Sequence, residues 1–260
     1  MSVAEPLAGK VVFVTGGARR IGRTIALALS RAGADVAISW RSSHAEAQQT
    51  VAEITALGHR ALAVECDVRS ELSVRMAIAA VLTEFGRLDL VVNNAAIFAS
   101  TALEDLTLEQ WDEVFETNAR GPFLVAREAL PHLRKAHGRI VNIGSLGGFH
   151  PWAGHAHYCA SKAALHMLTQ TMAKAFAPEV SVNCVAPGWI EMNDEQAMRH
   201  PSPDETQPRV GIEAAHFAAK TPMGRNGSAA DVAVAVLFFA TGPHFITGQT
   251  LTVDGGLGLT

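Results

Sequence analysis

Short apolar runs alternate with longer amphipathic stretches along the whole chain. The runs cover residues 10–15, 35–40, 61–65, 88–93, 139–143, 180–185 and 250–253. Most of them are apolar throughout, which is typical of strands buried on both faces of a parallel sheet. The amphipathic stretches are long enough for crossover helices and start near Ile21, Ala45, Glu71, Thr107, His155 and Ala229. This alternation predicts an α/β fold with a doubly wound parallel sheet of about seven strands and helices on both faces.

One segment departs from the alternation. Residues 191–220 carry Pro201, Pro203 and Pro208 among polar residues, and they follow the end of a predicted strand. A long irregular stretch in a compact domain is usually functional, and doubly wound sheets bind ligands at strand ends. The chain contains no internal repeat and no linker. We therefore expect a single domain over residues 1–260, with a substrate flap at about residues 190–220.

The composition excludes several classes of protein. With 48% hydrophobic and 18% charged residues, the 260-residue chain is not a disordered protein. Its formal net charge of −4 provides no basic field for nucleic acid or an anionic membrane surface. No apolar stretch approaches the ~20 residues that span a bilayer, and residues 1–10 lack the pattern of a secretion signal. We expect a cytoplasmic protein with a small-molecule substrate, and no nucleic acid or membrane partner.

The cysteines and histidines do not form a metal-binding pattern. Cys66, Cys159 and Cys184 are widely spaced without a C-x-x-C pair, which argues against both a disulfide framework and a zinc site. We expect all three to be reduced, with the last two near the candidate site. His150, His155 and His157 lack a companion ligand set, so no metal is expected. These histidines are either polar loop edges or substrate contacts.

The first predicted strand runs into a glycine-rich turn. Residues 15–22 read TGGARRIG and lead directly into an apolar helix. Glycines at such a turn let the backbone approach a pyrophosphate, whose charge then lies at the positive end of the helix. A tight loop without a ligand is the alternative. Arg19 and Arg20 within the turn either bind phosphate or face solvent.

The second predicted strand ends in SWRSS, residues 39–43. It offers no Asp or Glu to accept hydrogen bonds from a ribose 2′-hydroxyl, as an NAD site requires. A guanidinium makes charge-assisted bonds to phosphate, so Arg41, Ser42 and Arg20 are candidates to bind the 2′-phosphate of NADP(H). The alternative is a surface arginine beside a serine that caps the next helix, and for Ser43 we favour the cap.

A second cluster carries residues suited to proton transfer. The only tyrosine of the chain, Tyr158, lies four residues before Lys162, so the two share a helix face. A nearby ammonium favours the phenolate form, and Lys162 is therefore expected to lower the pKa of Tyr158. Ser145, at a strand end, is a candidate to bind a substrate oxygen, and Asn118 to order a water in a proton relay. Each residue taken alone also has a purely structural explanation.

These motifs together resemble the short-chain dehydrogenase/reductase family from Lys10 to about Gly256. The matching features are TGGARRIG, Asp67-Val68, NNAA at residues 93–96, Asn118, Ser145, the YxxxK of Tyr158 and Lys162, and Pro187-Gly188. The resemblance implies a Rossmann fold, hydride transfer between NADP(H) and a carbonyl or alcohol carbon, and a homotetramer. It assigns catalysis to Asn118, Ser145, Tyr158 and Lys162. The expected cofactor contacts are Gly16, Arg19, Arg20, Ile21, Arg41, Ser42, Asp67, Val68, Asn94, Ala95, Tyr158, Lys162, Pro187, Gly188 and Ile190.

The chain departs from the family pattern at three positions. Arg20 stands where the family has the middle glycine of the turn, NNAA replaces NNAG, and Met192 replaces a threonine. We expect cofactor binding to survive all three changes. The expected substrate contacts are Ser145, Phe98, Tyr158 and Trp189.

Two branches of the family and one non-catalytic role remain open. The general carbonyl reductases, including the 3-oxoacyl-acyl-carrier-protein reductases that act on acyl thioesters, share Ser145 and the FITGQTLTVDGG pattern of residues 245–256. The pteridine reductases share an arginine in the turn and a phenylalanine at Phe98, whose face can stack on a pterin. The third possibility is a nucleotide sensor on the same fold. An intact set of proton-transfer residues favours an enzyme, and we place the broad carbonyl reductase first.

Overall fold

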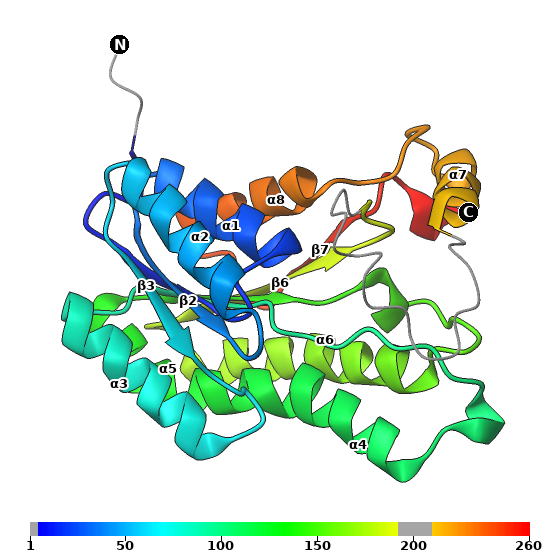
Figure 1. Cartoon of the computed structure of the whole chain (residues 1–260), viewed down its shortest axis with the longest axis horizontal. Helices are drawn as coiled ribbons and strands as arrows, with labels where there is room; N and C mark the ends of the chain where they lie inside the picture. Colours follow the sequence, from blue (N-terminus) through cyan, green and yellow to red (C-terminus); the bar gives the residue numbers. More distant parts are fainter. Residues whose placement is uncertain (1–4, 192–209) are drawn as a thin grey trace.

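The computed structural model describes residues 5–191 and 210–260, and its centre is one seven-stranded sheet (Figure 1). The strands are β1 (Val11–Val14), β2 (Asp35–Trp40), β3 (Ala61–Glu65), β4 (Leu90–Asn93), β5 (Arg139–Ile143), β6 (Ser181–Pro187) and β7 (Thr250–Val253). Every neighbouring pair is parallel, in the order β3-β2-β1-β4-β5-β6-β7. The predicted doubly wound parallel sheet is therefore confirmed.

Helices cover both faces of the sheet (Figure 1). One layer holds α1 (Arg20–Arg31), α2 (His44–Ala56) and α8 (Ala229–Thr241). The other holds α3 (Glu71–Phe85), α4 (Leu108–Phe115), α5 (Gly121–Ala136) and α6 (Ala156–Phe176). Short helical turns lie at η1 (Leu103–Asp105), η2 (Glu116–Arg120), η3 (Leu146–Gly148) and η5 (Leu257–Leu259). None of the described helices is long and apolar enough to cross a bilayer.

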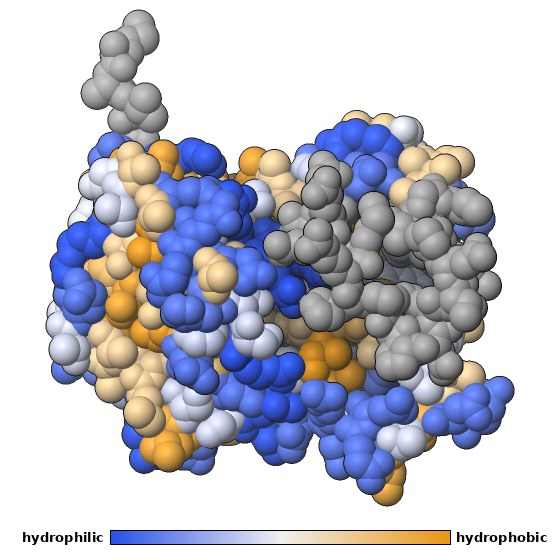
Figure 2. Space-filling model, viewed as in Figure 1, coloured by the Kyte–Doolittle hydropathy of each residue, from blue (hydrophilic) through white to orange (hydrophobic). Residues whose placement is uncertain are grey.

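Two apolar cores explain why the strands are apolar throughout. Successive side chains of a strand point to opposite faces of the sheet. Val12 and Val14 therefore pack with the α1, α2 and α8 layer, whereas Val11 and Phe13 pack with the α3 and α5 layer. A strand in this position needs apolar residues at every site. The surface is mixed instead, with polar and apolar residues interspersed across the face seen in Figure 2.

Two expectations about local structure are corrected. Residues 210–220 were expected to be irregular, but they form the helix α7 (Val210–Lys220). The helix expected to run on from Thr107 is divided by η2, a π-helical turn between α4 and α5. Such turns are frequent at functional sites because they redirect side chains from the regular helix. Residues 192–209 of the expected flap lie outside the described residues.

A buried carboxylate ties the two central strands at the edge opposite to their carboxyl ends. Asp89, just before β4, is 6% exposed, and it accepts hydrogen bonds from the Val11 N–H at 3.0 Å and Lys10 Nζ at 3.1 Å. It also accepts from Arg87 Nε at 2.7 Å and Arg87 Nη2 at 2.6 Å. Burial alone would raise the pKa of Asp89, but the bonds from Arg87, Val11 and Lys10 outweigh it and lower that pKa.

We predict that Asp89→Asn lowers the free energy of unfolding by about 1–3 kcal/mol at pH 7, because charge-assisted bonds to a buried group are lost. The folded pKa lies below the unfolded value of about 3.9, so the stabilisation is fully present above that pH and is lost as the pH falls through the folded value. Urea unfolding should give equal differences between the two proteins at pH 7 and 5, and a smaller one near pH 3. The exposed Asp112→Asn is the control, and equal stability of Asp89→Asn and wild type at pH 7 would contradict the prediction.

Candidate active site

A cavity of about 880 Å³ follows the carboxyl ends of the central strands. This is the edge at which a doubly wound sheet binds its ligands. The residues expected to contact cofactor or substrate all line it: Gly16, Arg19, Arg20, Ile21, Arg41, Ser42, Asp67, Val68, Asn94, Ala95, Phe98, Ser145, Tyr158, Lys162, Pro187, Gly188, Trp189 and Ile190. Asn118 is the one predicted site residue that is not part of this lining.

The glycine-rich turn between β1 and α1 is braced from β4. Asn94 Nδ2 donates to Thr15 O at 2.9 Å and to Gly16 O at 3.0 Å, and the backbone N–H of Asn94 donates to Thr15 Oγ1 at 3.0 Å. Gly22 has no room for a Cβ, which would collide with the Gly16 carbonyl and with Asn94. The turn is therefore packed tightly on β4 and on the start of α1, and Gly16 and Gly22 line the cavity.

Arg20 adopts a left-handed backbone conformation with φ of 52°. This region favours glycine, and a residue with a Cβ pays roughly 1–2 kcal/mol there. The turn thus keeps the backbone shape for which glycine is the usual choice, while adding a guanidinium to the cavity wall.

The end of β2 supplies a second cationic wall. Arg41 and Ser42 are exposed and line the cavity. Ser39 Oγ accepts a hydrogen bond from the Gly16 N–H at 3.1 Å, which ties this strand end to the glycine turn. Ser43 occupies the position before α2, as expected, but its side chain accepts no capping hydrogen bond.

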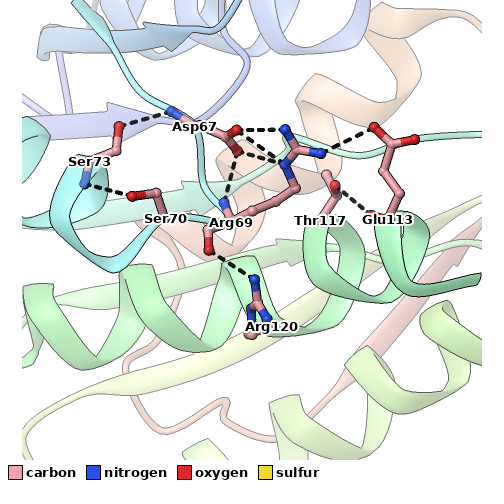
Figure 3. A network of polar contacts seen from close by, with 7 residues as sticks. All are labelled: Asp67, Arg69, Ser70, Ser73, Glu113, Thr117 and Arg120. Carbon is pink, nitrogen blue, oxygen red and sulfur yellow. Dashed lines mark hydrogen bonds and ion pairs between the residues drawn. The ribbon is translucent and has the colours of Figure 1, made fainter. Parts of the chain in front are cut away.

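Asp67 is held by a neighbour that the sequence reasoning missed (Figure 3). Arg69 donates to Asp67 Oδ1 from its backbone N–H and Nε, both at 3.0 Å, and to Oδ2 from Nη2 at 2.7 Å. These hydrogen bonds lower the pKa of Asp67. Arg69 also pairs with Glu113 of α4 at 3.1 Å, and Arg120 donates to the Arg69 carbonyl at 3.0 Å. A ligand that donates a hydrogen bond to Asp67 would have to share a carboxylate that Arg69 already engages.

Burial determines the protonation of Tyr158 and Lys162. Burial raises the pKa of the Tyr158 phenol to about 12, and its hydrogen bond with the Ser145 hydroxyl opposes this only in part. Burial lowers the pKa of Lys162 to about 8. Lys162 Nζ donates to Ile143 O at 2.8 Å and lies 5.8 Å from the Tyr158 ring centroid. The expected lowering of the pKa of Tyr158 by Lys162 is therefore wrong for this structure, and Tyr158 keeps its proton at neutral pH.

The side chain of Asn118 is engaged away from the cavity. Its oxygen accepts from the Ile97 N–H at 2.8 Å, and its Nδ2 donates to Ile97 O at 2.9 Å and to Ser161 Oγ at 3.1 Å. These bonds attach the loop after β4 to η2 and α6. The structure thus gives this side chain a bracing position, and its part in a proton relay stays a prediction.

His166 is a second residue that the sequence reasoning missed. It lies one helical turn after Lys162 and is buried, and its Nε2 accepts from the Ser145 N–H at 3.4 Å. The ring packs on Phe149 with centroids 4.3 Å apart. Burial, and then the charge of Lys162, lowers the pKa of His166 to about 4, so the imidazole behind Ser145 is neutral. Its spacing from Lys162 on one helix face was the available signal.

Aromatic rings surround the other end of the cavity. Phe98 packs against Tyr158 at a 90° interplanar angle and stacks on His155 at 20°, with centroids 4.8 and 4.7 Å apart. Trp152 is nearly parallel to Tyr158, at 14° and 6.3 Å. Trp189 stacks on Phe217 of α7 at 4.2 Å.

Not every expected neighbour reaches the cavity. His155 lines it, whereas His157 is fully buried and lines neither this cavity nor the smaller one beside it. All three cysteines are free, as predicted. Cys66 lines the cavity, and Cys184 is buried close enough to Lys162 for the ammonium to lower the pKa of its thiol, although burial raises that pKa to about 11 overall.

The chain is similar to known proteins in both sequence and fold. The family profile described as Enoyl-(Acyl carrier protein) reductase matches residues 16–258. A 3-oxoacyl-[acyl-carrier-protein] reductase of Synechocystis is 37% identical over 255 residues, which cover 96% of this chain and 98% of that protein. A short-chain dehydrogenase/reductase from Serratia marcescens is 34% identical, with a TM-score of 0.87 over 97% of this chain and 99% of that one. A blue fluorescent protein from a metagenomic library, solved in complex with NADPH, is also 34% identical, with a TM-score of 0.86 and the same coverage.

We predict that Gly148→Ala lowers the free energy of unfolding by about 1–3 kcal/mol, because overpacking strains its neighbours. A Cβ at Gly148 would lie 2.5 Å from His166 Cε1 and 3.0 Å from the Lys162 backbone. In a His166→Ala background the same change should cost much less, since the ring is then absent. Thermal and urea unfolding of the four proteins measure this coupling, and equal costs in both backgrounds would show that His166 is not the obstacle.

Proposed function

This chain belongs to the short-chain dehydrogenase/reductase family, and from that premise we propose that it is an NADPH-dependent reductase that converts a carbonyl group into an alcohol. The observation that carries this proposal is that Ser145, Tyr158 and Lys162 line one cavity together with the glycine turn, at the carboxyl ends of the strands. Burial raises the pKa of Tyr158 to about 12, so its phenol is protonated at neutral pH, as an unperturbed phenol also is. A group that holds its proton at neutral pH is suited to donate it to a carbonyl oxygen as that oxygen gains negative charge.

The roles of the catalytic residues follow from their contacts. The substrate carbonyl oxygen accepts hydrogen bonds from the hydroxyls of Ser145 and Tyr158. In the structure these two hydroxyls are hydrogen-bonded to each other. Lys162, charged below about pH 8, stabilises negative charge that develops near the phenol during proton transfer. Neutral His166 holds the Ser145 backbone without adding a competing charge. NADPH supplies the hydride when it is bound.

The cavity suits a dinucleotide phosphate. The start of α1 packs so closely on the glycine turn that a Cβ at Gly22 would collide with the Gly16 carbonyl, and both glycines line the cavity. A pyrophosphate in the cavity would therefore lie against the turn and the N-terminus of α1. Arg20, Arg41 and Ser42 line the adenosine end without a carboxylate from β2, which suits a 2′-phosphate rather than a free 2′-hydroxyl. Pro187, Gly188 and Ile190 would line the nicotinamide end. The NADPH complex of a structural relative supports the same cofactor.

The remaining proposals concern partners and assembly. A small-molecule or acyl thioester substrate is supported by the similarity to a 3-oxoacyl-[acyl-carrier-protein] reductase. A homotetramer is supported by apolar side chains exposed on the helices near Asn118 and Tyr158, since exposed apolar residues favour association: Leu108 is 77%, Met167 62% and Phe123 41% exposed. We also propose a cytoplasmic location.

The test of the function is Tyr158→Phe. Loss of the proton donor should lower kcat for ketone reduction about 10²–10⁴-fold, because positioned acid catalysis contributes that much. NADPH affinity, followed by nicotinamide fluorescence, should change little. Full turnover by the variant would exclude Tyr158 as the acid. Tight NADPH binding by a wild-type protein that reduces no carbonyl compound would favour the nucleotide sensor instead.

Arg41→Ala tests the choice of cofactor. Removing a charge-assisted bond of about 1.5–3 kcal/mol should weaken NADPH binding about 10–100-fold and leave NADH binding nearly unchanged. The matched control is Arg75→Ala on α3, an exposed arginine that lines neither cavity. Fluorescence titration of both nucleotides provides the two affinities. Tighter binding of NADH than of NADPH by the wild type would overturn the role of Arg41.

A further inference from the structure

The two ends of the cavity differ in charge. Its charged lining residues, among those the structure describes, are Arg19, Arg20, Arg41, Asp67 and Lys162. The first four belong to the glycine turn and to the ends of β2 and β3, where the adenosine half of the cofactor is proposed to lie. Lys162 is buried and bonded to Ile143 O. Among the described residues, the substrate end of this cavity therefore offers no exposed charged group to pair with a carboxylate or phosphate, and the nearest cation in the adjoining smaller cavity is Lys220.

The same end presents aromatic side chains, one of which is largely exposed. Phe98 is 58% exposed although it belongs to a concave site. Its ring is perpendicular to Tyr158, whereas Trp152 is within 14° of parallel to Tyr158. Phe98 and Trp152 are thus nearly perpendicular to each other. A flat ring that stacks on one of them presents its edge to the other, and both arrangements are favourable between aromatic groups.

We propose that the substrate carbonyl belongs to a planar, fused-ring aromatic ketone, and that Phe98 and Trp152 select it. This inference rests on the proposed reductase activity of the same site. A saturated ring or a linear acyl chain can fill the space but gains neither of the two oriented contacts. Tyr158, which contacts both rings, and Ser145 beside it then bind the ketone oxygen.

A second cavity gives such a substrate room to extend. It measures about 320 Å³ and shares four lining residues with the first: Pro151, Trp152, Trp189 and Phe217. Behind them lie apolar groups from η3 and η5, Leu146 and Leu257, together with Lys220. A second or third fused ring, or a polar substituent on it, fits this space.

The reaction balances without a further reagent. The ketone carbon gains a hydride from NADPH, and its oxygen gains the phenolic proton of Tyr158. The products are the secondary alcohol and NADP⁺, and Tyr158 recovers a proton from solvent.

Matched ketones test the selection. 2-Tetralone and trans-2-decalone share a carbon skeleton and an unconjugated carbonyl, and they differ in one aromatic ring. We expect kcat/KM with NADPH to be at least about tenfold higher for 2-tetralone, the equivalent of one or two aromatic contacts. Phe98→Leu and Trp152→Leu should each remove most of this preference, because each lowers kcat/KM for 2-tetralone more than for trans-2-decalone. Phe245→Leu, an aromatic residue 99% exposed and outside both cavities, is the control.

A binding measurement separates this inference from the proposed function and does not depend on the variants. Calorimetry with NADP⁺ present should show wild-type protein binding 2-naphthol about tenfold more tightly than trans-decahydro-2-naphthol. Equal or reversed affinities would overturn the aromatic preference, as would a kcat/KM for trans-2-decalone or acetoacetyl-coenzyme A that matches 2-tetralone. If the protein binds 2-naphthol preferentially but reduces no ketone, the aromatic selection stands and the proposed reductase activity is wrong.

Discussion

The parallel arrangement of a sheet buried on both faces is the constraint on which the rest of this structure depends. Parallel strands need crossover connections, so all seven strands end at the same edge. That edge gathers Gly16, Arg41, Asp67, Asn94 and Ser145 from segments up to 129 residues apart into one cavity. At the opposite edge, Asp89 accepts hydrogen bonds from Lys10, Val11 and Arg87. The buried carboxylate that stabilises the fold and the cavity that holds the candidate site therefore lie at opposite ends of the same strands.

Burial sets the protonation of the two residues proposed to move the proton. It disfavours the charged form of both Tyr158 and Lys162, although both side chains also line the cavity. The phenol keeps its proton, and the ammonium becomes easier to deprotonate. The backbone N–H of Ser145 donates a hydrogen bond to neutral His166, whose ring fills the space beside Gly144 and Gly148. The site thus combines a protonated phenol at Tyr158, a hydroxyl at Ser145 and an ammonium at Lys162. This combination suits the formation of an alcohol from a carbonyl.

The cavity has two regions of different character, which fits the proposal that it binds a cofactor and a substrate together. The region at the glycine turn and at the ends of β2 and β3 carries three arginines and Asp67. The other end is aromatic and uncharged in the part of the chain that the structure describes, and it suits an apolar ring. Tyr158 lies where the two regions meet, in contact with Phe98 and hydrogen-bonded to Ser145. This position fits the proposed role of Tyr158 as the proton donor between cofactor and substrate.

Sequence by itself determined the parallel sheet and most of its helices, because strand periodicity and glycine turns are local signals. With the family resemblance, it also determined every expected cavity residue except Asn118. Four strands, such as β2 at residues 35–40, have the predicted bounds. Only the tertiary structure decided the pairing of Arg69 with Asp67, the place of His166 behind Ser145, and the high pKa of Tyr158. These depend on packing and solvent exclusion between segments that are distant in sequence, which no local pattern records.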